Sequence, residues 1–274
     1  MHEIRFREIA KFVALVPLLL PLAGKADALF GNDLAGDRQL PRTWGIGVDY
    51  FDMNQPYQVD GLVLDLPPLA ALIPDPSVLP INNDIRHTDI KVDVWVAPFL
   101  NVFGIYGRID GDTQINLGVL GLPLPPATNT LTIDYDGSVT GGGIVFAIGG
   151  DRWFASVTGT VIRTNLDGDF KSTIDATTIQ PRIGMRFGDH TEFWVGGYIL
   201  DAEEKHSGTI DLDLGPFVPI PADNVGFAVD LSQEEDFNLS FGTHMMLSDA
   251  WEATIEVGAG DRRTVLGNIT YRFE

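Results

Sequence analysis

The last part of the chain, residues 251–273, alternates apolar and polar side chains with a period of two. The apolar positions share one side of two consecutive segments, and they are Trp251, Ala253, Ile255, Val257, Val265, Gly267, Ile269, Tyr271 and Phe273. A tight corner at 258–261 separates the two segments. Such alternation predicts two antiparallel β-strands, each with one apolar and one polar face. Aromatic residues at the ends of the apolar face are typical of strands that meet lipid.

Seven earlier segments show the same alternation and an eighth, at 192–201, is apolar on both faces, which brings the predicted count to ten strands. They fall near residues 44–50, 90–96, 101–110, 131–147, 153–161, 179–187, 192–201 and 225–247. The connections alternate between short turns, at 98–100, 149–151, 188–190 and 248–250, and mostly long loops, at 53–86, 111–128 and 206–224. This arrangement predicts an all-β fold, a transmembrane antiparallel up-and-down β-barrel of about ten strands, with eight or twelve as the alternative counts. Pro181, inside one strand, predicts a bulge.

A soluble β-sandwich or a lipocalin-like barrel is the competing fold for such a pattern. In that fold the apolar face would be a protein core, and the polar face would meet water. The aromatic ends of the apolar faces and the features of the N-terminus favour the membrane barrel.

Residues 1–28 have the features of an export signal. Arg5, Arg7 and Lys11 give a basic start, and an uncharged apolar run follows at 12–23. That run is too short to span a bilayer as a helix. Small residues at 26–28 suit a signal peptidase. We therefore predict a signal peptide at 1–28, a periplasmic segment at 29–42 and a barrel over 43–274.

The composition changes this picture little. The chain has no cysteine, which suits a protein that crosses an oxidising compartment unfolded. The net charge is −20, and removal of four basic and three acidic residues with 1–28 leaves −21. So acidic a chain would repel nucleic acid. No transmembrane helix, phosphate loop, zinc spacing or nucleotide fingerprint is present in the sequence, so we expect no cofactor.

The carboxy-terminal strand closes on Phe273, with Glu274 after it. A final strand that ends in an aromatic residue resembles the terminal strand of bacterial outer-membrane β-barrels. The pattern of the whole mature chain resembles small barrels of the OmpA/OmpW or porin-like kind, without a motif of any subfamily. The resemblance implies residence in the outer membrane of a Gram-negative bacterium, among its lipid and lipopolysaccharide. It also implies that Tyr271 and Phe273 form the signal read by the barrel-assembly machinery.

If the apolar faces meet lipid, the opposite faces line the lumen. The charged or titratable side chains predicted there are Lys91, Asp93, Arg108, Asp134, Asp136, Arg182, Arg186, His244, Glu252, Glu256 and Arg272. In a barrel of about ten strands the interior is narrow, and charges of both signs must pair to offset desolvation. One interpretation is a closed lumen held by ion pairs. The other is a narrow polar conduit whose acidic bias favours cations.

The predicted loops contain an apolar, proline-stiffened segment three times, at 58–70, 114–127 and 210–222. The residues predicted to form an apolar cap over the barrel are Leu62, Leu64, Leu66, Leu69, Leu117, Leu120, Leu122, Leu124, Leu214, Phe217, Val218 and Ile220. External loops are normally polar, so these side chains need a place to bury themselves. Three interpretations follow. The side chains pack on each other as a lid, they form a pocket for a hydrophobic molecule, or they form an adhesive surface.

Two histidine clusters near predicted strand ends are the candidates for catalysis. They are His87 with Asp84 and Asp89, and His206 with Glu203, Glu204 and Ser207. Neither has a spacing specific to an enzyme, and a histidine beside carboxylates at a rim is more often a solvated ion pair. We therefore predict a non-enzymatic passive channel or binding protein for a small hydrophobic solute. A closed structural or adhesive barrel is the alternative, and a hydrolase comes third.

Overall fold

The computed structural model describes residues 28–35, 40–71, 73, 75–121, 129–167, 171–188, 190–210 and 224–274. The strands are β1 (Trp44–Leu64), β2 (Ile81–Ala97), β3 (Leu100–Asn116), β4 (Thr130–Gly149), β5 (Trp153–Asp167), β6 (Lys171–Phe187), β7 (Thr191–Ile210), β8 (Val225–Gln233), β9 (Phe237–Met246), β10 (Trp251–Ala259) and β11 (Arg263–Phe273). Short helices are η2 (Asn32–Ala35), α2 (Pro67–Ala70), η3 (Pro76–Val78) and η4 (Leu117–Leu120). In the described residues, no helix has the length and apolar character needed to cross a membrane.

All the strands join in one antiparallel sheet that closes on itself. β11 pairs with β1 in a register that sets Trp44 opposite Phe273, so the first and last strands seal the barrel. β8 and β9 are two halves of the single strand predicted at 225–247, separated by residues 234–236. The wall therefore contains the ten predicted strand passages, and the predicted all-β barrel is confirmed.

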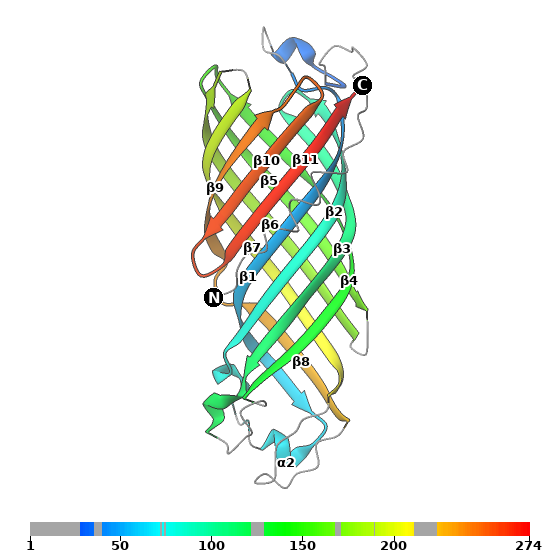
Figure 1. The fold of residues 1–274 in the computed structure, drawn as a ribbon, viewed down its shortest axis with the longest axis vertical. Helices are drawn as coiled ribbons and strands as arrows, with labels where there is room; N and C mark the ends of the chain where they lie inside the picture. The colour runs from blue at the N-terminus through cyan, green and yellow to red at the C-terminus, as the bar shows by residue number, and fades with distance from the viewer. Residues whose placement is uncertain are drawn as a thin grey trace.

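The two ends of the barrel differ in their connections (Figure 1). The turn end holds the short connections, after β2, β4, β6 and β9, together with the start of β1 and the end of β11. The loop end holds the longer connections, after β1, β3 and β7. In Figure 1 the carboxy terminus marks the turn end, and α2 lies at the loop end.

The strands reach farther toward the loop end than their alternation predicts. β1 runs to Leu64 and β2 begins at Ile81, so most of the loop predicted at 53–86 is strand. The predicted loops at 111–128 and 206–224 are strand only in their first part, where β3 continues to Asn116 and β7 to Ile210. Those loop predictions were wrong because the apolar positions change face partway along each strand, and this change hides the alternation.

The outer face of the barrel is apolar near the turn end and polar near the loop end. On β2, Ile90 and Val92 are exposed and apolar, while Arg86 on the same face is exposed and charged. The exposed apolar side chains that form this outer band include Trp44, Ile46, Val48, Val102, Ile144, Phe146, Ile148, Val157, Ile183, Phe187, Phe193, Leu239, Phe241, Ile255 and Val257. We call this zone the lipid band. A continuous apolar girdle of this kind on a closed barrel is the surface that a bilayer covers.

The edge of the lipid band runs level from strand to strand. Tyr50 on β1 is opposite Thr88 on β2, and two residues farther toward the loop end both outer faces are charged. On β6 and β7, Ile179 faces Ile199 within the band, while Thr177 faces Asp201 beyond it. A boundary shared by neighbouring strands indicates one membrane surface.

The inner face has the opposite distribution. Within the lipid band it carries polar side chains such as Asp89, Asp93 and Glu252, all of which are buried. Beyond the band it carries buried apolar side chains such as Met53 and Val139. The barrel is thus built like an outer-membrane barrel in one half and like a soluble barrel in the other.

The wall changes its strand number along its length. The β10–β11 hairpin ends partway along the barrel, and β8, which precedes β9 in the chain, lies beyond its tip (Figure 1). Beyond the tip, β8 pairs directly with β1 on one side and with β7 on the other. The barrel therefore has ten strands in the lipid band and eight beyond the hairpin.

Two local details complete the wall. The bulge predicted at Pro181 is absent: pairing between β6 and β7 pauses at 180–181 and resumes in the same register. Near the turn end, the backbone N–H groups of Leu29 and Phe30 donate to the carbonyls of Trp95 and Val96, which fixes the start of the 29–42 segment against β2.

The change of face along β2 gives a direct test of the lipid band. Val92→Arg places a charge in the middle of the band and should cost about 2–4 kcal/mol of folding free energy in a bilayer. Asn82→Arg, on the same face of the same strand but beyond the band, should change stability by about 0.5 kcal/mol or less. Urea unfolding in lipid vesicles measures both variants. Equal losses for the two would contradict the position of the band.

Candidate functional site in the lumen

The inner face within the lipid band carries a connected set of charges. Arg272 donates from Nε to Glu252, and its Nη1 lies 2.9 Å from Asp93 Oδ1. Asp93 also accepts a hydrogen bond of 2.7 Å from Asn101 Nδ2. The backbone opposite is Gly45, where a Cβ would lie 2.3 Å from Asp93 Oδ2. Glycine at this position therefore makes room for the carboxylate.

The set continues around the wall through a histidine. His244 lies between two carboxylates, with Nε2 3.3 Å from Glu252 Oε2 and Nδ1 3.9 Å from Glu192 Oε2. Arg186 completes this side, with Nε 2.8 Å from Glu192 Oε1. Basic and acidic groups thus alternate from β6 to β11.

A second buried pair lies beside this chain. Arg182 Nε is 2.8 Å from Glu256 Oε2, and Trp194 donates from Nε1 to the same carboxylate at 2.7 Å. The arginine also stacks on the indole, with Cζ 5.2 Å from the ring centroid. We call the whole set the polar belt: Asp93, Asn101, Arg182, Arg186, Glu192, Trp194, His244, Glu252, Glu256 and Arg272.

The polar belt joins opposite charges along the lumen wall, between neighbouring strands such as β10 and β11 and between strands two or three places apart, such as β11 with β2 and β6 with β10. Paired, hydrogen-bonded charges are what a desolvated interior requires, because an isolated buried charge costs several kcal/mol. Pairing of this kind is what the first of the two interpretations drawn from the sequence requires.

The structure distributes the residues predicted to line the lumen over both faces. The inner face carries Lys91, Asp93, Arg182, Arg186, His244, Glu252, Glu256 and Arg272. Arg108 on β3 and Asp134 and Asp136 on β4 are exposed on the outer face, so their assignment to the lumen was wrong. These positions lie beyond the lipid band, where water covers the outside and the apolar side chains turn inward.

Beyond the lipid band, the lumen is filled by two apolar clusters. The first contains Phe51, Met53, Ile85, Ile105, Ile109, Tyr135, Val139, Tyr198, Leu200 and Ala202. The second, nearer the loop end, contains Tyr57, Val59, Leu79, Ile81, Leu117, Val229 and Leu231, with Leu62, Ile73, Ile115, Leu120, Leu131 and Phe227 packed on it. We call the two clusters together the apolar interior. The hydrophobic effect that elsewhere drives a soluble core here drives the filling of this half.

The residues predicted to cap the barrel have different positions. Leu117 and Leu120, on η4, pack on the apolar interior, as does Leu62 on β1. A register shift at 59–61 turns Leu62 toward the lumen. Leu64 and Leu66 are half-buried near the same end. Outside the described residues or side chains lie Leu69, Leu122, Leu124, Leu214, Phe217, Val218 and Ile220.

A buried polar network crosses the apolar interior. Glu204 on β7 accepts from the Tyr57 hydroxyl and, at 3.4 Å, from Asn83 Nδ2. Asn83 Oδ1 accepts from the Tyr135 hydroxyl at 2.6 Å. These groups lie beyond the lipid band. Burial, followed by the charge of Glu204, raises the pKa of Tyr57 well above its ordinary value, so this phenol stays protonated and donates.

Both histidines singled out in the sequence point into the lumen rather than to the rim. His206 Nε2 lies 3.2 Å from Glu204 Oε2, and its Nδ1 lies 2.6 Å from Ser172 Oγ. His87 Nδ1 lies 2.5 Å from Asp89 Oδ2, with the ring of Phe51 4.8 Å away. The solvated ion pairs expected at these positions are therefore buried contacts.

Arg262, at the tip of the β10–β11 hairpin, is a buried residue that sequence reasoning missed. Its Nε donates to Gln55 Oε1 at 2.6 Å, and its Nη2 donates to the Glu235 carbonyl at 2.5 Å. Its Cζ lies 5.6 Å from the ring centroid of Tyr198, and its own carbonyl accepts from Asn238 Nδ2 at 2.7 Å. Arg262 thus occupies the interior at the point along the barrel where ten strands become eight. A basic residue in a hairpin corner gives no signal of this position.

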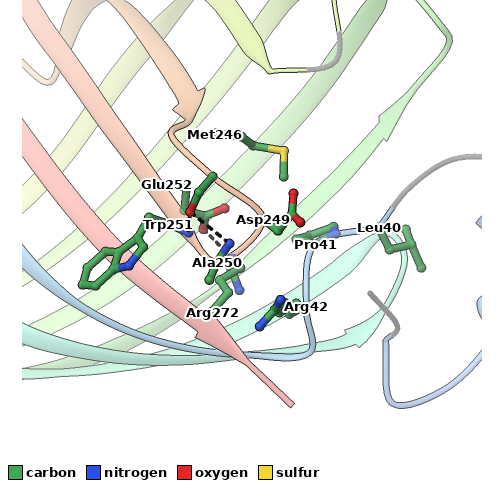
Figure 2. A pocket seen from close by; sticks show the side chains of 10 residues that line it. Leu40, Pro41, Arg42, Met246, Asp249, Ala250, Trp251, Glu252 and Arg272 are labelled. Atoms are coloured by element: carbon green, nitrogen blue, oxygen red, sulfur yellow. Dashed lines mark hydrogen bonds and ion pairs between the residues drawn. The ribbon is translucent and has the colours of Figure 1, made fainter. Parts of the chain in front are cut away.

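A hollow at the turn end lies next to the polar belt (Figure 2). It is lined by Leu40, Pro41, Arg42, Met246, Ser248, Asp249, Ala250, Trp251, Glu252 and Arg272. The segment before β1 therefore crosses close to the turn between β9 and β10. The carboxylate of Glu252 and the guanidinium of Arg272 form the inner side of this hollow.

Tyr271 and Phe273 lie at the turn end of β11, on its lipid-facing side. The ring of Tyr271 is 5.1 Å from that of Trp251 and 6.1 Å from that of Phe273. The three aromatics form one edge of the lipid band.

No family model matches the chain, and no curated protein matches it. Among solved structures, the chain is similar to the outer-membrane protease OmpT from Escherichia coli, at 7% identity and a TM-score of 0.47, with 85% of this chain and 97% of that one covered. It is also similar to OprG from Pseudomonas aeruginosa (9%, TM-score 0.40, covering 84% and 97%). A third is the toluene transporter TbuX from Ralstonia pickettii (6%, TM-score 0.31, covering 85% and 90%). The barrel assignment rests on the strand pairing and the lipid band.

The polar belt predicts unequal effects for two arginines. Arg272→Ala leaves Asp93 and Glu252 buried without their shared cation and should cost about 3–5 kcal/mol. Arg163→Ala breaks a pair with Asp175 that is exposed on the outer face, and it should leave the stability nearly unchanged because water screens the pair. Urea unfolding of both variants in the same lipid measures the difference. A loss of unfolding free energy below 1 kcal/mol for Arg272→Ala would contradict the buried ion pairing of the polar belt.

Proposed function

We propose that this protein resides in the outer membrane of a Gram-negative bacterium, with its turn end in the periplasm. The lipid band and the short turns at the end where the barrel begins and finishes support this orientation. Residues 1–28 then act as the export signal, and Tyr271 and Phe273 as the recognition signal for the assembly machinery. The lipid band contacts membrane lipid, and the polar outer face beyond it lies at the level of lipopolysaccharide.

The proposed activity is binding, and passive uptake, of a small hydrophobic solute through the loop end. The observation that carries this proposal is the apolar interior, which fills the external half of the lumen and reaches the loop residues Leu117 and Leu120. A lumen lined by apolar side chains offers a solute the environment that water does not. The polar tyrosines and Asn83 within it supply a few hydrogen-bonding groups that can orient a ligand.

The polar belt limits what passes. Its ion pairs join residues from β2, β6, β7, β9, β10 and β11 around the lumen wall, so hydrated ions would meet charges that are already paired with each other on most sides of the lumen. The protein on this proposal is a binding and uptake barrel rather than an open pore for ions.

The η4 helix provides a matched pair of variants to test solute binding. Leu117→Ser removes a buried side chain of the apolar interior, whereas Val119→Ser changes an exposed one on the same helix. We expect Leu117→Ser to weaken binding about tenfold, and Val119→Ser to leave it unchanged. Binding is measured by fluorescence of 1-aminoanthracene with protein in nanodiscs, after subtraction of protein-free nanodiscs. No saturable binding to the folded wild type would end this proposal.

A closed structural barrel is the second candidate, and the polar belt and filled interior favour it directly. The two candidates differ in planar bilayers after the belt is opened. With Glu252→Ala and Arg272→Ala combined, we expect steady ion conductance to appear where the wild type has little, because the paired side chains that occupy this part of the lumen are lost. Wild-type silence together with absent solute binding would leave the structural role. Strong wild-type conductance would contradict the closed belt itself.

A further inference from the structure

Three side chains on two neighbouring strands form a continuous hydrogen-bonded relay inside the loop half of the lumen. Ser172 on β6 is directly opposite His206 on β7, and both side chains face inward. Glu204, two residues before His206, shares that inner face. The two contacts of His206, 2.6 Å from Nδ1 to Ser172 Oγ and 3.2 Å from Nε2 to Glu204 Oε2, connect all three.

A carboxylate as deeply buried as that of Glu204 lowers the stability of the fold. Its exposed fraction is 1%, and in the described parts of the chain no lysine or arginine forms an ion pair with it. Its oxygens are satisfied by the Tyr57 hydroxyl, Asn83 and His206 instead. A buried carboxylate held by neutral donors stabilises a fold less than an apolar side chain of the same size would. Such a cost is typical of a functional group.

We propose that Ser172, His206 and Glu204 form a nucleophilic centre that hydrolyses esters of small apolar acids. Glu204 accepts the N–H of His206 Nε2 and thereby fixes the tautomer of the ring. The lone pair of Nδ1 is then directed at the Ser172 hydroxyl, which donates to it. A serine is a weak nucleophile unless a base is positioned to take its proton, and this arrangement supplies the base and the group that orients it.

The chemical steps balance without any other reagent than water. Ser172 Oγ attacks the ester carbonyl carbon, and its proton passes to His206 Nδ1. The bond from the carbonyl carbon to the alcohol oxygen breaks, and His206 returns the proton to that oxygen. A water molecule then attacks the acyl group on Ser172, with His206 taking and returning one proton. The products are the alcohol, the carboxylic acid and free Ser172.

The neighbouring side chains define the class of substrate. Val229 is directly opposite His206 on β8, and Leu231 is opposite Glu204. Both are buried members of the apolar interior, together with Tyr57. An acyl group beside the serine therefore contacts apolar side chains, so an apolar acid is favoured over a charged one. The site lies beyond the lipid band, so a substrate would approach from the loop end rather than from the bilayer.

The relay uses the ring nitrogens in the reverse of the order found in most serine hydrolases, where Nε2 meets the serine. Either nitrogen can accept a proton while the other donates, so no step depends on that order. On this proposal the chain is an enzyme, which differs from the expectation drawn from the sequence. Ser207, the serine adjacent to His206 in sequence, lies on the outer face. Ser172, thirty-four residues away, is the one in contact.

An alkyl fluorophosphonate tests the nucleophile directly, because phosphorus forms a bond with an activated serine oxygen as fluoride leaves. The full chain, folded in lipid and checked by heat-modifiable mobility, is treated with the probe, digested and analysed by mass spectrometry. We expect the adduct on the peptide that contains Ser172. Ser172→Ala should abolish labelling, and Ser207→Ala should label like the wild type. His206→Gln should slow labelling about 100-fold or more.

Turnover of p-nitrophenyl esters of short and medium-length acids provides the second measurement. We expect hydrolysis that depends on Ser172 and is faster for medium-length than for short acyl chains, because a longer chain contacts more of the apolar side chains beside the serine. Folded wild type without an adduct on Ser172 would overturn the proposal, whatever the variants do. So would His206→Gln that labels at the wild-type rate. Binding of 1-aminoanthracene is a separate readout, so solute binding and the nucleophile can succeed or fail independently.

Discussion

The position along the barrel at which lipid gives way to water determines which face of each strand is apolar. A barrel strand has two faces, and the solvent outside decides which face is apolar. Where hydrocarbon covers the outer face, Val92 and Ile90 point outward and Asp93 and Asp89 point inward. Where water covers it, Arg86 points outward and Ile85 points inward. Both arrangements satisfy the hydrophobic effect, but they require opposite patterns on one continuous strand. The polar belt and the apolar interior are the two inner faces that this exchange produces.

The exchange explains how far the sequence could be interpreted. Strands confined to the lipid band, such as β10 and β11, keep one pattern throughout, and their faces were predicted correctly. β3 and β4 extend far beyond the band. On these strands Tyr135 and Ile109 face the lumen, where apolar side chains pack. If the apolar face is assumed to point outward along the whole strand, Arg108, Asp134 and Asp136 are assigned to the lumen, whereas they lie on the outer face. A period of two identifies a strand but does not say which medium covers each face. The sequence also carries no sign of contacts between distant residues, such as Ser172 with His206.

Buried charge is treated differently in the two halves of the lumen. In the lipid band Arg272 and Arg182 meet Glu252, Asp93 and Glu256, so attraction between charges offsets much of their desolvation. In the loop half Glu204 is held by a phenol, an amide and an imidazole, none of which is a permanent cation. The ion pairs of the polar belt can be explained by their contribution to holding the strands of the wall together. Glu204 cannot be explained in that way, because an apolar residue would fill the same volume at lower cost.

The reduction from ten strands to eight is what makes the loop half suitable for such a group. The interior of a barrel narrows as strands are removed, and eight strands leave just enough room for side chains to fill it. Arg262 folds inward where the hairpin ends and covers the step between the two cross-sections. Between Arg262 and the loop end, β6, β7, β8 and β1 pair in this order and surround one small interior. The side chains that surround Glu204, His206 and Ser172 are fixed by four paired strands rather than by loops. A group held on rigid strands keeps its geometry, which is the condition that acyl transfer and selective binding share.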